Sequence, residues 1–128
     1  MNKTILGTGI FFGVTAIILG AFGAHGLKEN ILPEALQSYK TGVQYQMYHA
    51  LFLLILGVMN SLSARDKKLV FYLITTGVVF FSFSIYILST SAITGLNIGG
   101  IGLITPIGGV LLILGWLILG YRIYKQLN

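Results

Sequence analysis

The chain has 128 residues, of which 55% are hydrophobic and 9% are charged, and its formal net charge is +5. Soluble domains carry about 25% charged residues, so this composition excludes a water-soluble protein and predicts a single membrane domain over residues 1–128. The sequence contains no cysteine, which excludes disulfides, thiolate metal sites and cysteine nucleophiles.

Four apolar segments follow one another along the chain, at about residues 5–24, 45–62, 69–89 and 103–124. A helix of about 20 residues crosses a hydrocarbon core about 30 Å thick, and a helix satisfies its own backbone hydrogen bonds in lipid. The sequence therefore predicts an all-α integral membrane bundle of four transmembrane helices.

The first segment carries a stripe of small residues at helical spacing: Gly9, Gly13, Ala16, Gly20 and Ala24. Such a stripe lets a second helix approach closely, either within the bundle or between two copies of the chain. His25 follows the stripe, and Gly26 is expected to end the helix. His25 either bonds the last carbonyls of this helix or lines a pocket.

Pro33 and Glu34 suit the first turn of a helix, which we expect to start near Pro33 and to run into the second segment. Gln44, Tyr45 and His49 lie on this helix. An ionisable side chain inside the apolar segment is costly and marks a candidate site. The alternative for His49 is a neutral imidazole bonded to a tyrosine or to a carbonyl.

The second and third segments are joined by the short stretch SLSARDKK, which predicts an antiparallel helical hairpin. The third segment carries a polar stripe of Thr75, Ser82, Tyr86 and Ser89. These hydroxyls either bond neighbouring helices or their own backbone, or they line a polar path or ligand pocket.

The stretch TGLNIGGIGLITPIGG at residues 94–109 is uncharged and rich in glycine, and it contains Pro106. Glycine loosens a helix and proline removes a backbone donor. We therefore expect an irregular loop that packs on the rest of the protein or dips below the membrane surface, with Thr105, Gly108 and Gly109 as further candidate site residues.

Six of the eight lysines and arginines flank the segments on one side of the predicted membrane, and only Lys28 and Lys40 lie on the other. Positive loops stay in the cytoplasm, so both termini are expected there, in a multi-pass protein of the cell membrane. Because the cations flank apolar segments and form no patch, nucleic acid is not an expected partner.

Catalytic chemistry finds little support. The chain has two histidines and three acids, without the spacing of a metal site and without a nucleophile motif. No cofactor is implied, and a non-enzymatic protein is favoured, although an enzyme acting on lipid stays open as the last alternative.

The leading hypothesis is binding of lipid or a partner protein through an outward-facing pocket near His25 and residues 94–109. Its candidate residues are His25, Gln44, Tyr45, His49, Ser82, Tyr86, Thr105, Pro106, Gly108 and Gly109. The alternative is a small transporter or channel formed by a homo-oligomer.

Four stretches carry a family resemblance: GAFGAHGL at 20–27, YQMYHALFLLILG at 45–57, FSFSIYIL at 81–88, and TPIGG at 105–109 followed by GW at 115–116. In this order they resemble the transmembrane protein 256 family, also called domain of unknown function 423. The resemblance implies a small four-helix protein of the bacterial inner membrane or the plasma membrane. It implies no catalytic residue and no ligand.

Tags placed at the two ends of the chain should be protected from a membrane-impermeant reagent in intact cells, because the charge distribution puts both ends in the cytoplasm. Both tags should react once the membrane is opened. Labelling of one tag and not the other in intact cells would contradict an even number of spans.

Overall fold

A computed structural model describes residues 2–127, and the described residues form helices and no strand. The elements are α1 (Lys3–Phe22), the π-helical turn η1 (Gly23–Leu27), α2 (Pro33–Val58), α3 (Ala64–Val78), the π-helical turn η2 (Val79–Phe83), α4 (Ser84–Ser89), α5 (Ser91–Thr94) and α6 (Ile101–Leu127). Because α3, η2 and α4 are continuous, the chain forms four long rods.

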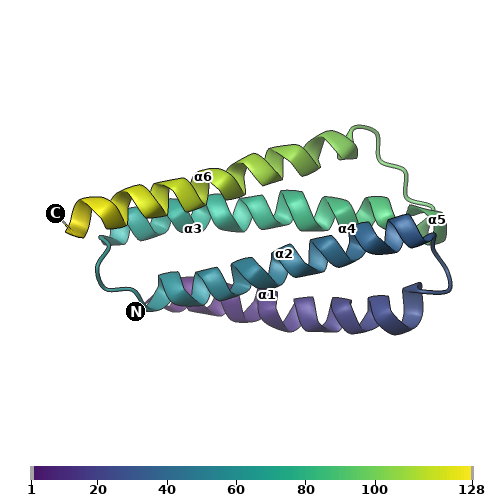
Figure 1. Ribbon diagram of the computed structural model, residues 1–128, viewed down its shortest axis with the longest axis horizontal. Helices are drawn as coiled ribbons and strands as arrows, with labels where there is room; N and C mark the ends of the chain where they lie inside the picture. The colour runs from purple at the N-terminus through teal and green to yellow at the C-terminus, as the bar shows by residue number, and fades with distance from the viewer. Residues whose placement is uncertain (1, 128) are drawn as a thin grey trace.

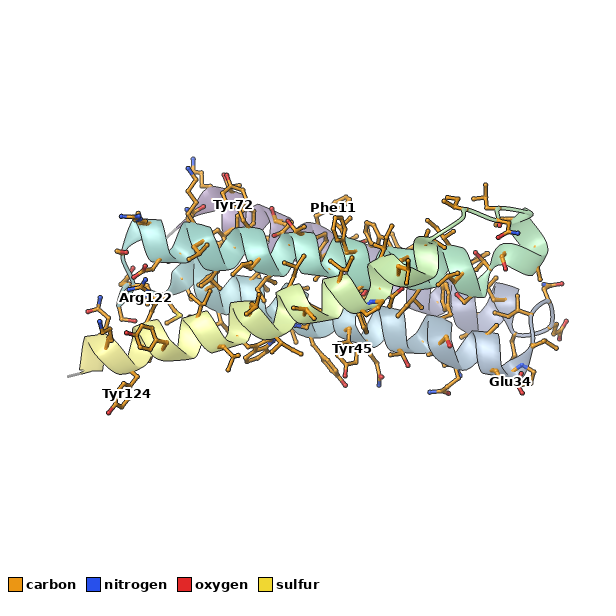
Figure 2. The ribbon with its side chains drawn as sticks, turned by 90° about the horizontal axis from the view of Figure 1, so that it is seen from above. Phe11, Glu34, Tyr45, Tyr72, Arg122 and Tyr124 are labelled. Carbon is orange, nitrogen blue, oxygen red and sulfur yellow. The ribbon has the colours of Figure 1, made fainter. Side chains whose placement is uncertain are left out.

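The four rods lie side by side in the order α1, α2, α3–α4 and α6, and consecutive rods run antiparallel (Figure 1). Both termini lie at one end of the bundle together with the α2–α3 connection, and we call this the terminal end. The α1–α2 connection, α5 and the loop before α6 lie at the other, the far end. Figure 2 shows Arg122 near the terminal end and Glu34 at the far end.

Local signals set where the helices begin. Asn2 Oδ1 accepts a hydrogen bond from the amide of Ile5 at 3.0 Å and caps α1, and Ser63 Oγ accepts one from the amide of Asp66 at 3.1 Å and caps α3. Pro33 opens α2 as expected from its preset backbone angle. Each of these helices therefore starts at a residue that either accepts a hydrogen bond from a free backbone N–H group or, in the case of proline, has no N–H group.

The carbonyl of Gly57 joins three rods at the terminal end. The amide of Asn2 donates to it at 3.0 Å, and Lys67 Nζ donates to it at 3.3 Å and to the carbonyl of Met59 at 2.7 Å. Carbonyls at a helix C-terminus lack partners within the helix, and the buried lysine supplies them. The predicted hairpin between the second and third segments is thus closed by Lys67.

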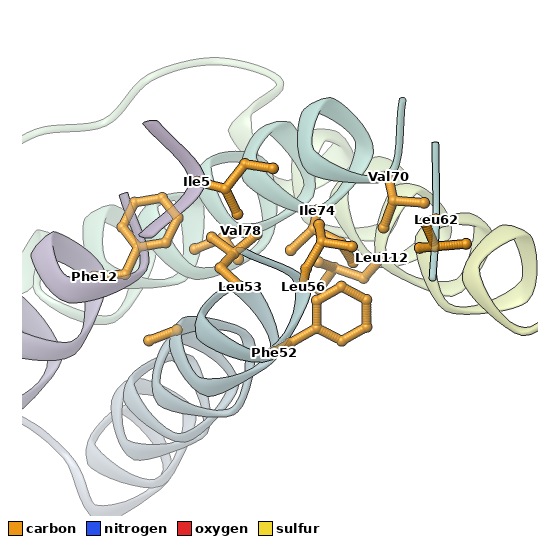
Figure 3. Close-up of a cluster of buried hydrophobic side chains, with 11 residues drawn as sticks. Ile5, Phe12, Phe52, Leu53, Leu56, Leu62, Val70, Ile74, Val78 and Leu112 are labelled. Carbon is orange, nitrogen blue, oxygen red and sulfur yellow. The ribbon is translucent and has the colours of Figure 1, made fainter. Parts of the chain in front are cut away.

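The core lies between the rods and the outside is apolar as well. Side chains such as Ile5, Leu53, Ile74 and Leu112 meet inside (Figure 3). The outward faces carry large hydrophobic side chains, including Phe11 on α1, which is 59% exposed, and others on every long helix. Water would penalise such a surface, whereas hydrocarbon accepts it.

Within residues 2–127, three stretches of helix are long and apolar enough to cross a membrane: Lys3–Leu27, Ala64–Ser89 and Ile101–Gln126. They correspond to the first, third and fourth predicted segments. The helix α2 is 26 residues long, but Gln44, Gln46 and His49 lower the hydropathy of its apolar half.

Two expected helix ends were wrong. The second segment was expected to reach Leu62, but α2 ends at Val58 because the backbone of Met59 is extended, and Lys67 binds the Met59 carbonyl. The first helix passes through Gly26 to Leu27 in the π-helical turn η1, and Asn30 Nδ2 donates to the Gly26 carbonyl at 2.6 Å.

The irregular stretch expected over residues 94–109 is shorter than predicted. It covers residues 95–100, where Gly95 and Gly100 have φ of 72° and 80°, values that favour glycine. The helix α6 already begins at Ile101 and contains Pro106. Proline there forfeits one backbone bond, but Thr105 and Gly108 bind and pack against the α3–α4 rod, which supports the helix.

The small residues of α1 face α2. A methyl group on Gly9 would lie 3.0 Å from the Ala50 carbonyl oxygen, and one on Gly20 would lie 3.4 Å from a methyl of Val43. Of the two alternatives for this stripe, packing within the bundle is therefore the one the structure supports.

Gly108 marks the closest approach between α6 and the π-helical turn η2. A methyl group on Gly108 would lie 2.7 Å from the Phe80 carbonyl carbon and 2.9 Å from the Gly77 carbonyl oxygen. These neighbours are backbone atoms, which cannot move aside as a flexible side chain does. This contact sets how deeply α6 seats on the α3–α4 rod.

Gly108→Ala should lower the free energy of unfolding by about 1–3 kcal/mol, the usual cost of overpacking. The matched control is Gly120→Ala in the same helix, where a methyl group would meet nothing within 4 Å, and it should be neutral or stabilising by up to about 1 kcal/mol. Unfolding in mixed detergent micelles measures both. Equal stability of the two variants would contradict the close approach.

Candidate functional site

A buried hydrogen-bond network links α1, α2 and α4 through Gln46, which has no exposed surface. Its Nε2 donates to the Phe12 carbonyl at 2.9 Å and to Thr15 Oγ1 at 2.7 Å. Its Oε1 accepts from the Tyr86 hydroxyl at 2.7 Å. Gln46 was not among the predicted site residues. Its position four residues before the buried Ala50 and seven before Leu53 is the signal that could have placed it on the inner face.

The polar stripe of the third segment is satisfied mainly within the bundle. Ser82 Oγ donates to the Gly42 carbonyl of α2 at 2.7 Å, and Ser89 Oγ donates to the Ile85 carbonyl at 2.7 Å. Thr75 Oγ1 is buried without a hydrogen-bond partner among the described residues. These contacts fit the structural alternative for the stripe, in which hydroxyls bond other helices or their own backbone.

His49 is held by two hydrogen bonds. Its Nδ1 lies 2.7 Å from the Tyr45 carbonyl, which can only accept, and its Nε2 lies 3.0 Å from Trp116 Nε1, which can only donate. The ring must therefore be neutral, with its proton on Nδ1. This is the structural alternative for His49, and the Trp116 hydrogen bond also explains how an indole is accommodated well inside the fourth segment.

A side groove of about 310 Å³ adjoins this pair between α2, η2 and α6. Three predicted site residues, Tyr45, His49 and Gly109, line it. The Tyr45 ring packs against Phe81 with 5.0 Å between centroids. Since both ring nitrogens of His49 are occupied, the wall of this groove is mainly aromatic and aliphatic.

A second groove, of about 360 Å³, opens at the far end between η1, α2, α4 and α5, and we call it the far-end groove. Its lining is mostly apolar and consists of Leu19, Phe22, Gly26, Leu27, Asn30, Tyr39, Tyr86, Thr90, Ile93 and Thr94. The Tyr39 hydroxyl donates to the Leu19 carbonyl at 2.6 Å, which ties α2 to α1 at the base of this groove.

The predicted site residues do not converge on one pocket. Among them Tyr86 lines the far-end groove, whereas His25 is exposed on η1 and is not one of its lining residues. Gln44 is exposed beside a separate surface hollow. Thr105 Oγ1 lies 2.5 Å from Ser84 Oγ, and Pro106 belongs to the helix α6. Within residues 2–127, no three histidine or acidic side chains cluster as metal ligands would.

The fold and its apolar exterior define a small helical membrane protein. Residues 19–109 match the family described as "Protein of unknown function (DUF423)", and the chain belongs to this family, which confirms the resemblance seen in the four sequence stretches.

Curated relatives extend the match over nearly the whole chain. A UPF0382 membrane protein of Staphylococcus saprophyticus is 42% identical over 123 residues, covering 96% of this chain and 98% of its own. The UPF0382 membrane protein YwdK of Bacillus subtilis is 40% identical over 127 residues, covering 98% and 99%. No solved structure matches.

His49→Phe should shift the fluorescence emission of the protein to shorter wavelength, because Trp116 is the single tryptophan and its indole N–H loses its acceptor. His25→Phe is the control, since His25 is exposed on η1, and it should leave the emission unchanged. Emission that is the same in the wild type and in His49→Phe would contradict the hydrogen bond.

Proposed function

We propose that this protein is a four-span, non-enzymatic protein of the cell membrane that binds a phospholipid in the far-end groove. The observation that supports this most directly is the groove itself, an apolar hollow of about 360 Å³ on a protein whose exterior already meets lipid. Its size falls within the range of about 300–1,000 Å³ typical of small-molecule sites.

The chemistry of the groove favours a lipid over a polar metabolite. Leu19, Leu27 and Ile93 supply apolar walls. The Asn30 amide and the Thr90 hydroxyl already donate to nearby carbonyls, at 2.6 Å in each case. With its polar atoms engaged, the groove offers mainly apolar surface, which suits the upper part of an acyl chain.

The proposed topology rests on the distribution of lysine and arginine along the chain and on the position of α2 among the other rods. The far end holds Lys28 and Lys40, and six of the eight cations lie at the terminal end, so the terminal end is placed in the cytoplasm. The antiparallel order of the four rods (Figure 1) supports a fourth crossing, made by α2 beside its neighbours. The groove then lies near the outer surface of the membrane.

The other candidate functions have less support. The transporter alternative rested on the polar stripe of the third segment, and Ser82, Tyr86 and Ser89 are bonded to protein atoms. An enzyme using His49 as a base would need a free ring nitrogen, and both nitrogens are engaged. Binding of a partner protein or of a second copy is not favoured by any particular contact.

Ile93→Trp should fill the far-end groove and abolish most of the thermal stabilisation that added phosphatidylcholine gives to the delipidated protein. Ile93 is 49% exposed, so the larger side chain does not disturb the core. Ile98→Trp is the control, because Ile98 is 48% exposed, lies in the following loop and does not line the groove. Equal stabilisation of both variants and of the wild type by phosphatidylcholine would overturn the proposal.

A further inference from the structure

The terminal end concentrates positive charge. Lys3 lies in the first turn of α1, Arg65, Lys67 and Lys68 lie in the first turns of α3, and Arg122 and Lys125 lie in the last turns of α6. Asp66 is the one acidic residue in this region of the sequence. The excess of cations is therefore local to one end of the bundle.

Some of these cations already have partners. Lys67 is buried and donates to two carbonyls, and Arg122 Nε lies 3.4 Å from Asp66 Oδ1, the one ion pair among the described residues. Lys125 Nζ lies 5.3 Å from the centroid of the Tyr121 ring. The side chains of Lys3, Arg65 and Lys68 are exposed, so their charges are accessible to a ligand outside the chain.

A groove of about 380 Å³ lies beside these cations, between the first turns of α1 and α3. Asn2, Thr4 and Lys68 supply polar groups to its lining, and Ile5, Phe71 and Tyr72 supply apolar surface. The Lys68 ammonium lies 6.0 Å from the centroid of the Tyr72 ring, within the range of a cation–π contact. The groove therefore combines a positive charge with apolar and aromatic surface.

We propose that this groove binds the headgroup of an anionic phospholipid. A phosphodiester meets the Lys68 ammonium, with the side-chain Nδ2 of Asn2 and the hydroxyl of Thr4 in the same groove, and the first carbons of the acyl chains pack along Phe71 and Tyr72. Basic pockets beside membrane helices bind anionic headgroups in this manner. The far-end groove, by contrast, is not lined by a lysine or an arginine, so the two sites select different lipids.

The test compares phosphatidylglycerol with phosphatidylcholine on the full chain in detergent, with binding followed by native mass spectrometry. The wild type should prefer phosphatidylglycerol, and Lys68→Gln should reduce that preference about five-fold, the usual weight of one lysine near an anionic surface. Lys68 is exposed, so the variant should fold. Lys28→Gln removes the same charge from an exposed site at the far end and should retain the preference.

Three results would overturn the proposal: equal binding of the two lipids, an equal loss in Lys68→Gln and Lys28→Gln, or displacement of the lipid by millimolar inorganic phosphate. The second result would indicate a response to net charge, and the third a site for a free anion. The two sites are separated by repeating the comparison in the Ile93→Trp background. With the far-end groove filled, phosphatidylcholine bound there no longer contributes, and the preference for phosphatidylglycerol and its loss in Lys68→Gln should remain.

Discussion

The structure depends on the close approach of helices at glycine. Lipid chains are as apolar as leucine, so membrane helices gain little from hiding apolar surface from one another, and packing and hydrogen bonds must hold them together. Gly9 brings α1 onto the Ala50 carbonyl of α2, and Gly108 brings α6 onto the backbone of η2. Once the rods are this close, short polar side chains can bridge them.

A few buried polar side chains form these bridges, through hydrogen bonds made by both polar atoms of the amide or imidazole. Gln46 joins α2 to α1 and to α4 with three hydrogen bonds, and His49 joins α2 to α6 through Trp116. In a medium without water, an unpaired polar group is expensive, so these partners also specify which helix face meets which. The same saturation leaves these buried groups with few free atoms for binding or chemistry.

The sequence predicted the helices well, whereas the candidate site residues do not come together in one pocket of the structure. Hydropathy and Pro33 were sufficient for the four rods, because each signal is local. The fourth segment was predicted from about residue 103, close to the start of α6 at Ile101. The irregular stretch was expected to reach residue 109 because glycine and Pro106 suggested a loop, whereas tertiary contacts of Thr105 and Gly108 support a helix there. Gln46 shares a helix face with Ala50 and Leu53, but it was missed because the burial of that face is known only from the structure. His25 was expected in a pocket with residues 94–109, whereas it is exposed on η1 and does not line the far-end groove.

The carbonyl of Gly57 has a consequence for assembly. It accepts from Asn2 and from Lys67, two residues separated by half the chain. During synthesis the Asn2 amide can gain this partner only after nearly all of α2 has been made, and the Lys67 bond can form only after the first turn of α3. The closure of the terminal end therefore cannot be complete until the chain has been synthesised past its midpoint.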